Sequence, residues 1–365
     1  MFEKTETTLK NALKSVKEPT TGLTLNELAV EPDIQMKGAE ADITLTLGYP
    51  ADGIAETLAQ AVNDAASAVK GVESVAVNID WDIPACGGAN TSGSIPGVKN
   101  IIAIASGKGG VGKSTTAVNL ALALAAEGAR VGILDADIYG PSQPQMLGIG
   151  ERRPEILDID GKQMMRPIEA HGIQSISMGY LVTEQTPMVW RGPMVSGALQ
   201  QLLTQTHWDN VDYLIVDMPP GTGDIQLTLS QKVPVTGAVI VTTPQDIALL
   251  DAQKGIEMFR KVKVPVLGVV ENMAVHICSN CGHEEHIFGA GGGERIAQDY
   301  ETTLLGSLPL DLSIRETTDG GSPTVVAEPD SAITASYRAI ARQLGASLWR
   351  TFGKARGPVI AVADD

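Results

Sequence analysis

The chain contains 365 residues, of which 43% are hydrophobic and 19% are charged, and its formal net charge is −16. This length and composition allow about two ordinary domains with a buried core and exclude global disorder. The acidic balance argues against general nucleic-acid binding, which needs a basic face. No apolar run is long enough to span a membrane, the start lacks a signal-peptide pattern, and three cysteines suit a reducing compartment. We therefore expect a cytoplasmic protein with no membrane and no nucleic-acid partner.

Residues 1–85 are predicted to form a small α/β domain. Apolar residues recur at helical spacing over residues 9–16 and again over 54–69, which predicts two amphipathic helices. Apolar residues alternate with polar ones over 43–47 and 75–79, which predicts two half-buried strands. The order helix, strand, helix, strand favours a compact layer of helices on a sheet.

Residues 86–98 are interpreted as a linker because they are rich in Gly and Ser. Over residues 99–350, short apolar runs recur without alternation, so both faces of these strands should be buried. This pattern predicts a doubly wound, mostly parallel sheet covered by helices. Residues 351–365 are predicted to be a short C-terminal tail. The apolar runs are Ile101–Ala105, Val131–Leu134, Tyr213–Val216, Ala238–Val241 and Val266–Val270.

A glycine-rich run at residues 107–115 fits the phosphate-binding pattern G-x-x-x-x-G-K-[ST] and lies between a predicted strand and a predicted helix. Its glycines let backbone N–H groups form a tight anion cradle, to which the helix N-terminus adds positive charge. We expect Lys113 to contact the β- and γ-phosphates and Ser114 to bind Mg²⁺. A second lysine, Lys108, can reach outward toward a neighbouring subunit. The expected nucleotide-binding residues of the run are Gly107, Lys108, Gly109, Gly110, Val111, Gly112, Lys113, Ser114 and Thr115.

Acidic residues follow two of the predicted strands. Asp135 and Asp137 come after one apolar run, and Asp217 comes after another. An acid at the carboxyl end of a parallel strand faces the ligand crevice. We expect Asp217 to hold Mg²⁺ through water and Asp137 to orient the attacking water; the alternative for Asp135 or Asp137 is a solvated loop acid or a helix cap. Residues 219–223 suit a switch loop that reads the γ-phosphate. The predicted catalytic residues are Lys108, Lys113, Asp137 and Asp217.

Cys278 and Cys281 are spaced to hold one metal centre, but a single pair supplies too few thiolates for a four-cysteine site. Two such pairs facing each other across a twofold axis would supply four, for a [4Fe–4S] cluster or for tetrahedral Zn²⁺. A single-chain site with two of the nearby histidines is an alternative, although their spacing is unlike a zinc finger. A redox Cys-x-x-Cys is another, but the expected thioredoxin-type setting is absent. Cys86, on the linker, is not expected to be a ligand.

Together these residues resemble the Mrp/ApbC family of iron–sulfur cluster carrier ATPases, in the deviant Walker A group that includes MinD, ParA and the nitrogenase iron protein. The resemblance implies a homodimer that binds ATP and Mg²⁺, with Lys108 reaching nucleotide across the dimer and Asn272 near the adenine. It implies that Cys278 and Cys281 bridge a [4Fe–4S] cluster, which is passed to apo-proteins. The resembling segments are Gly107–Thr115, Asp135–Ser142, Arg191–Gln200, Asp217–Asp224, Glu271–Met273, Cys278–Cys281 and Ile287–Gly289.

The N-terminal domain resembles the small iron–sulfur assembly domain that is often fused to these ATPases. Relatives often carry a cysteine shortly after the second strand, and residues 45–53 here contain none, so we expect a docking platform for the cluster assembly machinery. A positioning ATPase like MinD or ParA is a second possibility. The acidic end at 357–365 and the lack of a basic patch disfavour it. A third is a zinc-stapled dimer. For the cluster carrier we expect slow, regulatory ATP hydrolysis.

Overall fold

The computed structural model describes the chain except for residues 1, 88–93, 160, 181–191 and 354–365. The middle of the predicted linker, the start of the Arg191–Gln200 segment and most of the predicted tail therefore lie outside the described residues. The chain divides into two compact units. One is Ala85–Leu344, and the other joins Met1–Pro84 to the end of the chain from Gly345. The predicted domain boundaries differ from this division chiefly at the C-terminal end, and they stay a prediction.

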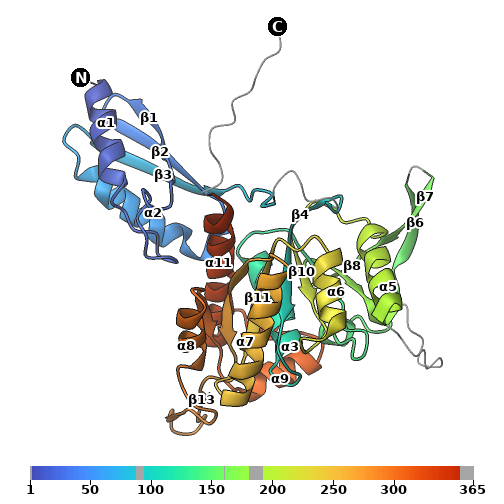
Figure 1. The fold of residues 1–365 in the computed structure, drawn as a ribbon. Helices are drawn as coiled ribbons and strands as arrows, with labels where there is room; N and C mark the ends of the chain where they lie inside the picture. Colours follow the sequence, from blue (N-terminus) through green and yellow to red (C-terminus); the bar gives the residue numbers. More distant parts are fainter. Residues whose placement is uncertain (1, 88–93, 160, 181–191, 354–365) are drawn as a thin grey trace. The chain divides into compact units, whose positions relative to one another are not determined.

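The smaller unit is a three-stranded sheet with two helices (Figure 1). Strands β2 and β3 are parallel, and β1 pairs antiparallel with β2. Side chains of β2 alternate between buried and exposed, so one face of the sheet forms the core, where α1 and α2 contact each other. The predicted order omitted β1, a five-residue edge strand whose alternation is too short to predict. The elements are α1 (Phe2–Leu13), β1 (Asp33–Lys37), β2 (Glu40–Leu47), α2 (Asp52–Ser67) and β3 (Ser74–Trp81).

The last turns of the C-terminal helix α11 (Ala332–Gly353) belong to this smaller unit. The Trp349 ring lies 5.8 Å from the Tyr49 ring, centroid to centroid, and Ala346 is buried in the same core. A Cβ on Gly48 would collide with the Trp349 indole, so this position needs a glycine for packing. The core of the smaller unit is therefore completed by residues from the end of the chain.

The larger unit contains an eight-stranded sheet in the order β15-β12-β11-β4-β10-β5-β9-β8 (Figure 1). Every neighbouring pair is parallel except β8 and β9. The doubly wound, mostly parallel sheet predicted from the unbroken apolar runs is thus confirmed. Its strands are β4 (Val98–Ala105), β5 (Val131–Asp135), β8 (Ile168–Ala170), β9 (Ile173–Ser177), β10 (Val211–Asp217), β11 (Gly237–Thr242), β12 (Val266–Glu271) and β15 (Leu304–Ser307).

Helices pack against this sheet. The helix after the glycine-rich run, α3 (Lys113–Ala126), contacts β4, β5 and β10, and it is buried around most of its circumference. That burial explains its small, apolar composition. Helix α7 (Asp246–Lys261) contacts β11. The remaining helices of this unit are α4 (Gln143–Met146), α5 (Gly192–Thr204), α6 (Asp224–Lys232), α8 (Gly292–Asp299), α9 (Leu312–Asp319), α10 (Thr324–Ala327) and the 3₁₀ turn η1 (Met178–Tyr180).

Two hairpins that form separate two-stranded sheets were not predicted. One joins β6 (Glu155–Ile159) to β7 (Lys162–Arg166), and the other joins β13 (His276–Ile277) to β14 (Glu284–Glu285). Their strands are largely exposed, so they lack the hydrophobic periodicity on which strand prediction depends. Within the described residues, no helix has the length and apolarity needed to cross a membrane.

Candidate nucleotide and metal site

Strand β4 leads directly into residues 107–115, and α3 begins at Lys113. Gly110 and Gly112 have φ of +81° and +79°, in the left-handed region that favours glycine. A Cβ on Gly112 would also collide with the Asn272 side-chain amide, and one on Gly107 with the Asp251 backbone carbonyl. The glycines are therefore required both by the backbone conformation and by close neighbours.

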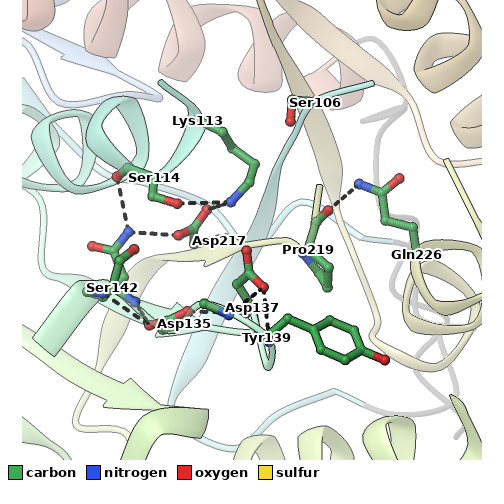
Figure 2. A network of polar contacts seen from close by, with 12 residues as sticks. Ser106, Lys113, Ser114, Asp135, Asp137, Tyr139, Ser142, Asp217, Pro219 and Gln226 are labelled. Carbon is green, nitrogen blue, oxygen red and sulfur yellow. Dashed lines mark hydrogen bonds and ion pairs between the residues drawn. The ribbon is translucent and has the colours of Figure 1, made fainter. Parts of the chain in front are cut away.

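Lys113 and Asp217 form a buried ion pair at the carboxyl end of the sheet (Figure 2). The Lys113 ammonium contacts Oδ1 of Asp217 and lies 3.1 Å from Oγ of Ser114. The Asp217 side chain is fully buried and that of Lys113 is 6% exposed. The pair forms because β4 and β10 are neighbours, so their carboxyl ends meet. The structure thus brings together three residues that the sequence assigned to phosphate and Mg²⁺.

Asp135, at the end of β5, is fully buried and organises the loop that follows it. Its Oδ2 accepts hydrogen bonds from the Ser142 and Gln143 backbone N–H groups, at 2.9 and 3.1 Å, and from the Ser177 hydroxyl at 3.0 Å. Burial, helped by the charge of Asp217, raises the pKa of Asp135 to about 7, although these hydrogen bonds oppose the rise. Asp135 is therefore not a solvated loop acid.

Asp137 is 8% exposed and lies in the same region of the molecule. Its Oδ1 accepts hydrogen bonds of 3.3 Å from the backbone N–H groups of Tyr139 and Gly140 (Figure 2). Burial raises the pKa of Asp137, and the nearby charge of Lys113 opposes that rise. The carboxylate thus stabilises a turn and also interacts electrostatically with the Lys113–Asp217 pair. Its role toward an attacking water stays a prediction.

Asn272 directly follows β12 and supports the glycine-rich loop. Its side-chain N–H donates to the backbone carbonyl of Val111 at 2.9 Å, and the residue is 7% exposed. This contact places Asn272 against the P-loop, while its position near an adenine stays a prediction. Its amide also explains the absence of a side chain at Gly112.

The predicted switch loop lies against the start of the P-loop. The Gly221 N–H donates to the Ser106 carbonyl at 3.0 Å, and the Ser106 hydroxyl donates to the Lys108 carbonyl at 2.9 Å. The Gln226 side-chain N–H donates a hydrogen bond to the Pro219 carbonyl at 2.7 Å (Figure 2). The Lys108 side chain is half-buried. Ser106 thus contacts both the predicted switch loop and the Lys108 backbone.

Cys278 and Cys281 lie between β13 and β14, where the Cys278 N–H donates to the His283 carbonyl at 2.9 Å. Cys281 is exposed and Cys278 is half-exposed. Hydrogen bonds from the backbone of Asn280 and then of Cys281 lower the pKa of Cys278, which favours its thiolate form.

The thiol pair is incomplete as a metal site within one chain. Across the part of the chain that the structure describes, no three His, Cys, Asp or Glu side chains gather in a way that would hold a metal ion. Nδ1 of His276 and Nδ1 of His286 each contact a backbone carbonyl, at 3.1 and 2.8 Å. Each contact uses Nδ1 and keeps Nε2 as the ring nitrogen for a metal, so the single-chain site with histidine ligands stays an alternative. Cys86 is buried.

Gln143 is a site residue that sequence reasoning missed. It is fully buried, and its side-chain N–H groups reach both Asp217 and the Ser114 backbone carbonyl. A single glutamine in a loop carries no spacing pattern that would reveal this role. Only its position one residue beyond the resembling segment Asp135–Ser142 hinted at the region.

A parallel sheet with a P-loop after β4 and a buried Lys113–Asp217 pair at the neighbouring strand end defines a P-loop NTPase. Residues 97–345 match the family described as NUBPL iron-transfer P-loop NTPase, within the ParA group, and residues 6–79 match the iron–sulfur cluster assembly protein family. The chain belongs to the iron-transfer P-loop NTPase family.

Characterised relatives agree with this assignment. The chain is 63% identical to an iron–sulfur cluster carrier protein of Pseudomonas fragi, over 78% of this chain and 99% of that one. It is 51% identical to the carrier protein of Haemophilus influenzae, over 93% and 91%. It is 55% identical to the mouse (Mus musculus) iron–sulfur cluster transfer protein NUBPL, over 68% and 78%.

Solved structures support the fold. A nucleotide-binding protein of Archaeoglobus fulgidus in complex with ADP is 34% identical, with a TM-score of 0.57 over 67% of this chain and 92% of that one. The cell division ATPase MinD of Pyrococcus furiosus is 22% identical, with a TM-score of 0.51 over 67% and 98%, and this likeness concerns the fold alone.

Proposed function

We propose that this protein is an ATP-hydrolysing carrier that holds a [4Fe–4S] cluster between two copies of the chain and transfers it to apo-proteins. One observation carries the proposal. A complete P-loop site and an exposed, incomplete pair of thiols occur in the same compact unit. The names of the relatives, carriers of iron–sulfur clusters, support the choice of cargo.

The nucleotide half of the proposal rests on the P-loop and Asp217. Residues 107–115 would cradle the phosphates, Lys113 would contact the β- and γ-phosphates, and Ser114 and Asp217 would hold Mg²⁺. Hydrolysis of this kind needs positioning and charge stabilisation and no covalent intermediate. Asp137 would orient water, and Asn272 would lie near the adenine. We expect slow turnover that regulates the cluster.

The cluster half rests on the exposure and chemistry of the two thiols. Iron–sulfur clusters are held by cysteine thiolates, four for a [4Fe–4S] cluster. Each chain offers Cys278 and Cys281, so two chains together supply the full set. An exposed site with a favoured thiolate at Cys278 suits a cargo that must be loaded and released. The smaller unit would dock the cluster assembly machinery.

Anaerobic reconstitution tests this proposal. The wild-type protein should take up about four iron and four sulfide per dimer, as a four-thiolate [4Fe–4S] site requires. The double variant Cys278→Ser/Cys281→Ser should lose this content, whereas the matched control Cys86→Ser, which removes a buried thiol, should keep it.

A full cluster in the double variant would refute the ligand assignment. About one zinc ion and no iron per anaerobically purified dimer would instead favour the zinc-stapled alternative, because Zn²⁺ accepts the same four thiolates.

A further inference from the structure

The Gln143 side chain joins two parts of the nucleotide site. Its Nε2 donates to Oδ2 of Asp217 at 2.8 Å and to the backbone carbonyl of Ser114 at 3.0 Å. The residue begins helix α4 and is fully buried. One amide group therefore fixes the carboxylate at the end of β10 relative to the first turn of α3.

These two contacts determine which way the amide faces. Both partners are acceptors, so the NH₂ group must point toward them, because a flipped amide would place its oxygen against a carboxylate and a carbonyl. Oε1 of Gln143 consequently faces the other way. This oxygen is buried and has no hydrogen-bond partner within the described residues.

The neighbours of the amide are the groups expected to hold Mg²⁺, Asp217 and the first turn of α3. Both side-chain hydrogen bonds come from Nε2, so the amide acts on these groups through its donors. Mg²⁺ demands near-ideal ligand geometry, and a carboxylate that is already fixed in position meets that demand.

We propose that Gln143 is a positioning residue of the Mg²⁺ site: Nε2 holds the Asp217 carboxylate in place relative to the first turn of α3. This inference rests on the proposed nucleotide function. Lys113 occupies Oδ1 of Asp217 and Gln143 contacts Oδ2, so the two side chains together set the rotation of the carboxylate.

Asp135 also fixes the backbone of Gln143. Oδ2 of Asp135 accepts hydrogen bonds from the backbone N–H groups of Ser142 and Gln143, which anchors the start of α4. Asp135 thus acts on the site through Gln143. This arrangement explains why a buried carboxylate is kept at the end of β5.

The test separates metal binding from nucleotide binding. A fluorescent ADP analogue is titrated into the full-length protein with EDTA present, and Mg²⁺ is then titrated into the complex. In Gln143→Ala, metal-free affinity should stay within about twofold, whereas the Mg²⁺ midpoint should rise about tenfold, as expected for the loss of carboxylate positioning.

Two further variants make the result decisive. Gln143→Met keeps the side-chain volume without the amide and should show the same shift in the Mg²⁺ midpoint. Gln145→Ala removes an exposed amide from the same short helix and should leave the midpoint unchanged. Circular dichroism and thermal denaturation identify which variants are folded.

Two results would overturn the inference: an unchanged Mg²⁺ midpoint in folded Gln143→Met, or an equal loss of metal-free and Mg²⁺-dependent affinity. Failure of the wild-type protein to bind the ADP analogue at all would instead refute the proposed nucleotide function.

Discussion

At the scale of single residues, the site depends on carboxylates that are kept away from water. Asp217 and Asp135 are fully buried at the ends of adjacent strands. Asp217 is compensated by the Lys113 ammonium. Asp135 accepts three hydrogen bonds, while its burial, helped by the charge of Asp217, raises its pKa.

The raised pKa of Asp135 predicts a pH-dependent stability. Between about pH 4 and pH 7 the folded protein keeps a proton on Asp135 that the unfolded chain has released. The free energy of unfolding should therefore fall as the pH rises through this range, by at most about 1.4 kcal/mol per pH unit for one proton.

Urea unfolding of the nucleotide-free protein between pH 4.5 and 7.5 measures this, with Asp135→Asn as the comparison. The stability of the wild type relative to the variant should decrease as the pH rises. A difference that increases with pH would show that burial does not raise the pKa of Asp135.

At the scale of elements, α3 links the P-loop to the rest of its unit. Its N-terminus carries Lys113, and just beyond its C-terminus the fully buried Glu127 accepts hydrogen bonds from Arg338 and Arg342 on α11, both at 2.6 Å. When a buried carboxylate is shared by two guanidinium groups, removing its charge strongly destabilises the folded protein. The helix that presents the phosphate site is thus anchored at both ends.

Glu127→Gln should lower the free energy of unfolding by about 3 kcal/mol, because two arginines lose their countercharge. The matched control is Glu257→Gln on α7, whose exposed carboxylate lies 3.6 Å from Arg260, and it should cost less than about 0.5 kcal/mol. Chemical denaturation of both variants checks this, and similar losses in the two would show that the Glu127 anchor contributes little.

At the scale of the whole molecule, the proposed function requires two copies of the chain. The thiol pair of one chain is incomplete, and Lys108 is proposed to act on nucleotide bound by the other chain. A shared site of this kind can be tested by mixing variants, because a mixed dimer of two defective chains contains one intact site.

Lys108→Ala should reduce ATP hydrolysis far more than ATP binding. Lys113→Ala should abolish hydrolysis, because it removes the lysine that contacts the β- and γ-phosphates. Mixing the two inactive variants should restore about one quarter of the wild-type hydrolysis rate, since random pairing makes half of the dimers mixed, with one intact site each. No recovery, with mixed dimers verified by pull-down of differently tagged chains, would contradict a role for Lys108 across the dimer.

Much of the architecture follows from local patterns in the sequence. Unbroken apolar runs identified the five strands at the centre of the sheet, because a strand covered on both faces has no polar side. The glycine spacing identified the P-loop, because few other residues adopt the required backbone conformation. Short, exposed or edge strands such as β1, β6 and β8 escaped prediction, because they bury too little to leave a pattern.

The sequence by itself determined the fold class, the nucleotide-binding loop and the pair of thiols, since each is encoded in the spacing of neighbouring residues. Only the tertiary structure decided which distant groups meet. The order of strands places Asp217 beside Lys113, and the turn anchored by Asp135 brings Gln143 to both Asp217 and Ser114. Such contacts depend on the order of the strands in the sheet. The role of Gln143 follows from its hydrogen-bond partners, which lie on other elements of the fold.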